Sequence, residues 1–106
     1  MSPPEPSRAS DPVSRPGPAL IGLTGTLREK VFPIHPAPRG LTVGRSPDND
    51  VVISDMLAVS RYHAQVIPED GTFVLYDRDS LNGTVVNDQR VFRHDLRHGD
   101  QIQIGG

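Results

Sequence analysis

Short runs of apolar residues alternate with clusters of turn-forming residues along most of this chain, and no window has the apolar spacing of an amphipathic helix. Little or no helix is therefore expected. The predicted strands are residues 20–26, 30–35, 41–44, 51–53, 63–67, 72–76, 84–86, 90–92 and 101–104. Many short strands at this density predict an all-β fold, an antiparallel β-sandwich of two sheets.

Turn residues suggest how some of these strands are connected. Asp70-Gly71 is a strong signal for a tight hairpin between the strands on either side of it. Asp88-Gln89 is expected to form a second tight turn, and residues 20–35 a first hairpin. These connections favour antiparallel neighbours along most of the chain.

The first 19 residues do not share the strand pattern. They hold six of the 11 prolines and almost no large apolar side chain. Such a segment cannot bury enough apolar surface to offset its ordering entropy, so residues 1–19 are predicted to form a disordered tail. Residues 20–106 are long enough for one domain with a single modest core.

Composition excludes several classes of function. The formal net charge is −2, whereas a nucleic-acid platform would need a basic patch and a high pI. Without cysteine the chain cannot form disulfides, iron–sulfur clusters, cysteine-ligated zinc or a catalytic thiolate. No signal peptide and no apolar run long enough for a membrane span are present. We expect a cytoplasmic protein without nucleic-acid or membrane partners.

Four clusters of polar residues and glycines fall between or beside the predicted strands. They are Gly44-Arg45, Ser60-Arg61-Tyr62-His63, Asn82-Gly83-Thr84 and Asn87. Their order and spacing, with the Gly99-Asp100-x-Ile102 run near the end, resemble the forkhead-associated (FHA) domain over residues 20–106. The resemblance implies an eleven-stranded β-sandwich that binds phosphothreonine peptides with loops at one end. It also implies a partner phosphorylated by a Ser/Thr protein kinase, no cofactor and no catalysis.

The resemblance assigns phosphate binding to Arg45 and Ser60, with Arg61 as a supporting cation. A guanidinium fork suits phosphate oxygens because it can donate two parallel hydrogen bonds. Asn82 is expected to bind the peptide main chain. At Leu81 some family members have threonine, so here only the backbone amide is expected to donate. The residues expected to shape the loops are Gly44, His63, Gly83, Thr84 and Asn87.

The resemblance raises two further expectations about the ends of the chain. Some small bacterial members carry a threonine in an N-terminal tail that is captured by their own site. Residues 1–19 contain serines but no threonine, so the ligand is expected in trans. Family members usually continue beyond the Gly99-Asp100 turn into another strand, so the chain is expected to be a fragment that lacks this last strand.

Particular residues are also compatible with three other functions. Ser60, His63 and Asp77 are the residue types of a hydrolytic triad, but no nucleophile elbow accompanies them. His94 and His98 have the i, i+4 spacing of metal ligands on a helix, without a third ligand in register. Catalysis and metal binding are therefore not expected. The third alternative, an FHA-like sandwich that serves as a phosphate-independent interaction or oligomerisation module, stays open.

Overall fold

The structure is a computed structural model that describes residues 17–34 and 37–105. The predicted tail lies outside the described residues except for its last three positions, where Ala19 already begins the first strand. The statements below concern the described residues alone.

The all-β prediction is confirmed, because the described residues form ten short strands and one three-residue 3₁₀ helix. In chain order they are β1 (Ala19–Ile21), η1 (Gly25–Leu27), β2 (Val31–Pro33), β3 (Leu41–Gly44), β4 (Val51–Val52), β5 (Ala64–Glu69), β6 (Thr72–Asp77), β7 (Thr84–Val86), β8 (Gln89–Val91), β9 (Arg93–Asp95) and β10 (Ile102–Ile104). The hydrogen-bonded groups are β1-β2, β10-β7-β8 and β4-β3-β5-β6-β9. Every pair is antiparallel except β3 with β4, which the sequence did not indicate.

The core lies between the five-stranded and the three-stranded groups. Alternation along each strand turns apolar side chains inward, as Leu41 and Val43 show on β3. They pack in one cluster with Val66 of β5, Leu75 of β6 and Val86 of β7. A core of this kind makes the strands a rigid frame for the loops that join them.

Three details differ from the sequence predictions. The first hairpin is present but short, because η1 begins at Gly25 and takes up the last two residues of the strand expected over residues 20–26. The second tight turn is at Asn87 and Asp88, which both have left-handed φ angles, while Gln89 already pairs with Val86 in β8. Strand β9 was not predicted, because its sequence Arg-His-Asp has no apolar residue to reveal an edge strand. The Asp70-Gly71 hairpin is confirmed, with φ angles of 51° and 82°.

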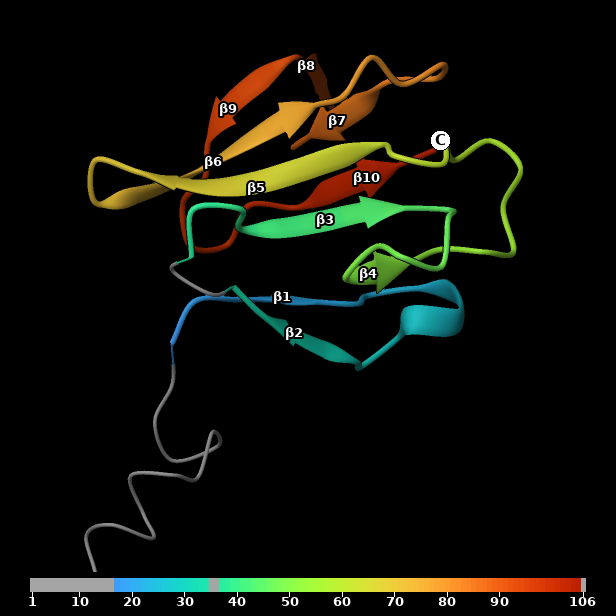
Figure 1. The fold of residues 1–106 in the computed structure, drawn as a ribbon, viewed down its shortest axis with the longest axis horizontal. Helices are drawn as coiled ribbons and strands as arrows, with labels where there is room; N and C mark the ends of the chain where they lie inside the picture. Colours follow the sequence, from blue (N-terminus) through green and yellow to red (C-terminus); the bar gives the residue numbers. More distant parts are fainter. Residues whose placement is uncertain (1–16, 35–36, 106) are drawn as a thin grey trace, which may run out of the picture.

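The ends of four strands bring three loops to the same side of the sandwich. Strands β3 and β6 end there, and β5 and β7 begin there, on the right of Figure 1. The loops at this end are residues 45–50 after β3, residues 53–63 before β5 and residues 78–83 between β6 and β7. Three of the four sequence clusters lie in or beside these loops.

Candidate ligand-binding site at the loop end of the sandwich

Arg45 follows directly on β3 and is tied to the loop before β5. Its backbone N–H donates to the carbonyl of Ser60 at 3.0 Å, and its side-chain Nε donates to the carbonyl of Val59 at 3.0 Å. Within residues 17–34 and 37–105, no group accepts from the two terminal nitrogens of the guanidinium. The fork is therefore held in place by one nitrogen, while the other two are available for an anion.

Gly44 allows the two loops to lie this close together. A Cβ atom at this position would lie 2.1 Å from the carbonyl oxygen of Arg61 and 2.7 Å from Nδ2 of Asn49. Contacts this short would force the loops apart, so a residue without a side chain is required here. The requirement is steric rather than conformational, since Gly44 is not among the residues with positive φ.

His63 is fully buried and joins two of the loops. Its Nδ1 accepts the backbone N–H of Ser60 at 3.0 Å, which leaves Nε2 to donate to the carbonyl of Gly83 at 2.8 Å. Both ring nitrogens are therefore engaged with backbone groups. The ring makes no hydrogen bond to the Ser60 hydroxyl, so the geometry of a nucleophile and its base is absent from this pair.

Ser60 and Leu81 are connected across the same gap. The backbone amide of Leu81 donates to the Ser60 Oγ at 3.0 Å, which orients the hydroxyl and leaves its proton for another acceptor. The sequence led us to expect this amide as a donor in the site. In the structure it supports Ser60, and the Leu81 side chain is 83% exposed.

Asn82 presents one free acceptor at the rim of the site. Its Nδ2 donates to the carbonyl of Ala58 at 2.9 Å, and among the described residues no donor reaches its Oδ1. Gly83, which follows, has a φ of 91° that only glycine adopts without strain. An amide oriented in this way can accept a hydrogen bond from the main chain of an extended ligand.

The loop between β6 and β7 is organised by a carboxylate that the sequence suggested only as a triad member. Asp77 accepts the hydroxyl of Ser80, the backbone N–H of Ser80 at 3.1 Å and the hydroxyl of Thr84 at 2.7 Å. Ser80 Oγ in turn accepts the N–H of Gly83 at 3.0 Å. Burial raises the pKa of Asp77, but the hydrogen bonds from Ser80 and Thr84 outweigh burial and the net pKa is lowered.

Substitution of Asp77 with Asn gives a test of this network. A lowered pKa in the folded state means that the ionised carboxylate adds stability above its unfolded pKa of about 4, and that this contribution is lost as the pH falls below that value. We expect Asp77→Asn to unfold more easily at pH 7 by about 1–3 kcal/mol, with a difference from wild type that shrinks towards pH 3. Urea denaturation at a series of pH values measures it. Asp79→Asn, in the same loop, serves as the exposed control, and a difference independent of pH would contradict the assignment.

Two residues that were not predicted from the sequence, Asn49 and Asp48, also support the site. Asn49 is nearly buried, and its Nδ2 donates to the carbonyls of Ser46 at 2.9 Å and Arg61 at 2.8 Å. Asp48 accepts the hydroxyl of Tyr62 at 2.8 Å, and its pKa is lowered by hydrogen bonds from Ser46 and Tyr62. In the sequence both residues belong to a cluster of turn formers, and burial of an amide side chain has no signature there.

Asn87 is the one predicted site residue that does not lie at the loop end of the sandwich. It occupies the β7–β8 turn at the other end of β7, where its Nδ2 donates to Asp100 at 2.9 Å and its Oδ1 accepts the N–H of Gln101 at 3.0 Å. It therefore shapes a different loop from the one expected. His94 lies in the same region and its Nε2 is 3.0 Å from Oδ2 of Asp100, while His98 is exposed.

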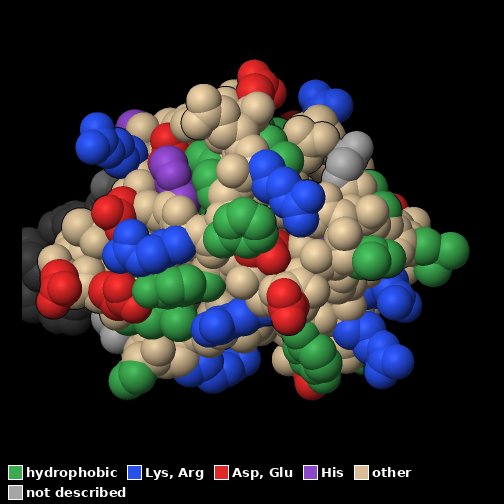
Figure 2. Space-filling model, turned by 90° about the horizontal axis from the view of Figure 1, so that it is seen from above, with side chains coloured by type: hydrophobic (Ala, Val, Ile, Leu, Met, Phe, Trp, Pro, Cys, Tyr) green, Lys and Arg blue, Asp and Glu red, His purple; other side chains and the backbone are tan. Residues whose placement is uncertain are grey.

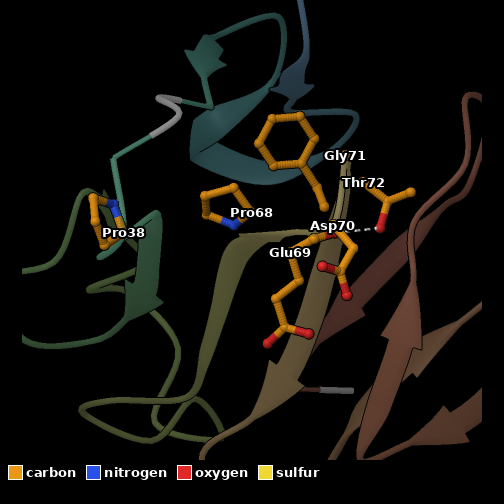
Figure 3. Close-up of a pocket in the computed structure, with 7 residues that line it drawn as sticks. Pro38, Pro68, Glu69, Asp70, Gly71 and Thr72 are labelled. Carbon is orange, nitrogen blue, oxygen red and sulfur yellow. Dashed lines mark hydrogen bonds between the residues drawn. The ribbon is translucent and has the colours of Figure 1, made fainter.

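A shallow hollow lies away from the candidate site, at the β5–β6 hairpin. Figure 3 shows it at the far end of β5 from His63, where Thr72 Oγ1 donates to the Glu69 carbonyl at 3.0 Å.

Across residues 17–34 and 37–105, no three His, Asp or Glu side chains are grouped to hold a metal ion. Within the same ranges, no helix has the length and hydropathy needed to cross a membrane.

The sequence profile of the FHA domain matches residues 41–105, from the start of β3 to the residue after β10. The chain belongs to the FHA family. The predicted resemblance and the predicted sandwich are thereby confirmed. FHA domains are binding modules, which groups the chain with binding proteins rather than with a family of enzymes.

Individual relatives support the same assignment. The glycogen accumulation regulator GarA of Mycolicibacterium smegmatis is 45% identical over 64 residues, which are 60% of this chain and 40% of GarA. The ABC transporter ATP-binding/permease protein Rv1747 of Mycobacterium tuberculosis is 44% identical over 68 residues, 64% of this chain and 8% of the transporter. The FHA chain thus spans less than half the length of these two relatives.

Solved structures of similar fold include complexes with phosphopeptides. The N-terminal FHA domain of Rad53p from S. cerevisiae, in complex with a phosphothreonine peptide, superposes with a TM-score of 0.56 at 36% identity. The match covers 61% of this FHA chain and 55% of that one.

Proposed function

We propose that this FHA domain binds phosphothreonine-containing segments of other proteins and so links the products of a Ser/Thr protein kinase to whatever the domain is attached to. The observation that supports the proposal most strongly is the Arg45 guanidinium. It is fixed to the loop before β5 through Nε and retains two donors for a doubly charged phosphate.

The other groups fit the remaining parts of such a ligand. Ser60 has a hydroxyl proton available beside Arg45, and Arg61 adds a second exposed cation to the same loop. Asn82 offers a free carbonyl oxygen to the peptide main chain. The geometry of Ser60, His63 and Asp77 favours a binding role over hydrolysis, so the proposed function includes no catalytic step.

Titration by fluorescence anisotropy tests the proposal. Peptides from a degenerate library are compared in phosphothreonine, phosphoserine and unphosphorylated forms. We expect binding in the micromolar range, about −8 kcal/mol, for phosphothreonine. The serine form lacks one methyl group, whose burial contributes roughly 0.8 kcal/mol, so it should bind a few-fold more weakly. The unphosphorylated form should not bind at these concentrations. Equal binding of all three forms would instead favour a phosphate-independent interaction module.

A further inference from the structure

A cation and an aromatic ring lie together on the outer face of the β7–β8 hairpin. Arg90 in β8 pairs with Val85 of β7, whereas the next pair, Val91 with buried Thr84, faces the core. Phe92 lies at the bend between β8 and β9, directly after Val91. The Arg90 Cζ lies 5.6 Å from the centroid of the Phe92 ring, and that ring is 70% exposed.

This pair directly adjoins the candidate site. A Cβ atom placed on Gly83 would lie 2.7 Å from Nε and 3.0 Å from Cζ of Arg90, so the guanidinium rests against Gly83. Gly83 follows Asn82, whose free oxygen is the proposed acceptor for the ligand main chain. A peptide held there would therefore pass beside Arg90.

Arg90 differs from another arginine that lies over a ring. Arg93 is 6.0 Å from the Tyr76 ring centroid and also pairs with Glu69 and Asp95. No carboxylate within residues 17–34 and 37–105 forms an ion pair with Arg90, whose guanidinium lies over the Phe92 ring. Stacking on a ring limits the rotamers of the side chain while its five donors stay available. An anionic side chain is the complementary partner for such a group.

We propose that Arg90 and Phe92 form a second subsite, which binds an acidic side chain of the phosphothreonine peptide. The proposal rests on the proposed function, because Asn82 must first hold the peptide main chain. The carboxylate accepts from the Arg90 fork, and the peptide covers part of the exposed Phe92 ring. Arginine and aromatic side chains are the types that most often dominate binding surfaces.

The preference should depend on position rather than on total charge. Figure 2 shows Lys and Arg side chains interspersed with Asp and Glu on the face it presents, so that face does not attract acidic peptides as a whole. One localised cation beside one loop recognises one neighbouring residue of the ligand. An acidic residue elsewhere in the peptide should have no effect.

A positional scan of the peptide tests the subsite. The parent peptide has alanine at every position within about four residues of the phosphothreonine. In each variant peptide, one of these alanines is replaced by aspartate. We expect one position, or two adjacent ones, to tighten binding about three- to fivefold, the upper part of what an exposed ion pair supplies. Raising the salt concentration should reduce this gain, because exposed charges are screened.

Two protein variants locate the effect. Arg90→Ala should remove the gain from aspartate and leave the affinity for the parent peptide unchanged, which also reports that the variant is folded. Arg97→Ala removes the same charge from an exposed arginine in the turn before β10, away from the site, and should keep the gain.

The outcomes separate the two proposals. If no aspartate position improves binding to the wild type, or if the gain persists in Arg90→Ala, the subsite is overturned. Binding that still depends on phosphothreonine would then leave the proposed function intact. If no peptide binds in a phosphothreonine-dependent manner, the proposed function fails and the subsite fails with it.

Discussion

Replacement of Arg45 with alanine is expected to abolish measurable phosphothreonine-peptide binding at micromolar peptide concentrations. The phosphate would lose its fixed fork and remain partly desolvated without a partner, at a cost of about 2–5 kcal/mol. That cost corresponds to a loss of roughly 30-fold to several thousand-fold in affinity. Isothermal titration calorimetry of wild type and variant against the same phosphopeptide measures it.

The lysine variant shows whether fork geometry or charge alone matters. Arg45→Lys keeps the charge, but one ammonium group cannot bond the Val59 carbonyl as Nε does and also donate two parallel bonds to phosphate. We expect binding about tenfold weaker than wild type. Thermal unfolding of both variants provides the folding control, since the lost bond to Val59 is worth about 1 kcal/mol. Wild-type affinity in Arg45→Ala would rule out Arg45 as the phosphate ligand.

Replacement of His63 with alanine is expected to produce a large loss of folding stability. The side chain is fully buried, and its removal leaves a cavity, an unpaired Ser60 N–H and an unpaired Gly83 carbonyl. Together these cost about 3–5 kcal/mol, a large fraction of the stability of a small domain. Urea denaturation followed by circular dichroism measures the change in midpoint.

Two conservative variants divide the effect between the two hydrogen bonds. His63→Asn retains an acceptor near the position of Nδ1, and His63→Gln retains a donor near the position of Nε2. Each should recover part of the stability, about 1 kcal/mol, because each restores one buried bond. His98→Ala, at an exposed histidine, should stay within about 0.5 kcal/mol of wild type. If His63→Ala were as stable as His98→Ala, the histidine would not hold the loops together.

The strand pattern and the turn residues were enough to predict the sandwich, because alternation and Asp-Gly chemistry act locally. Strand β9 could not be predicted in this way, since an edge strand of polar residues has no apolar side to mark it. The turn between β7 and β8 was misplaced by one residue because Asn, Asp and Gln all tolerate turns, and the pairing of Gln89 with Val86 decides between them.

The candidate site was predictable to a similar extent. The motifs located Arg45, Ser60 and Asn82, since their spacing in the chain resembles a known family. Spacing does not reveal that the backbone amide of Leu81 donates to Ser60 Oγ, or that the Asn49 side chain bridges two loops through hydrogen bonds. Such contacts depend on how loops distant in sequence meet, so only the three-dimensional arrangement discloses them.

The segment before β5 supports the site through main-chain carbonyls and leaves the side chain of Leu57 exposed. The carbonyls of Ala58 and Val59 hold Asn82 and Arg45, whereas the neighbouring Leu57 side chain is 87% exposed. Substitutions at Leu57 can therefore alter what the rim of the site contacts without moving the groups proposed to grip the phosphate. Partner preference and the proposed phosphate contact are thereby assigned to different atoms of one short segment, an exposed side chain for the first and main-chain carbonyls for the second.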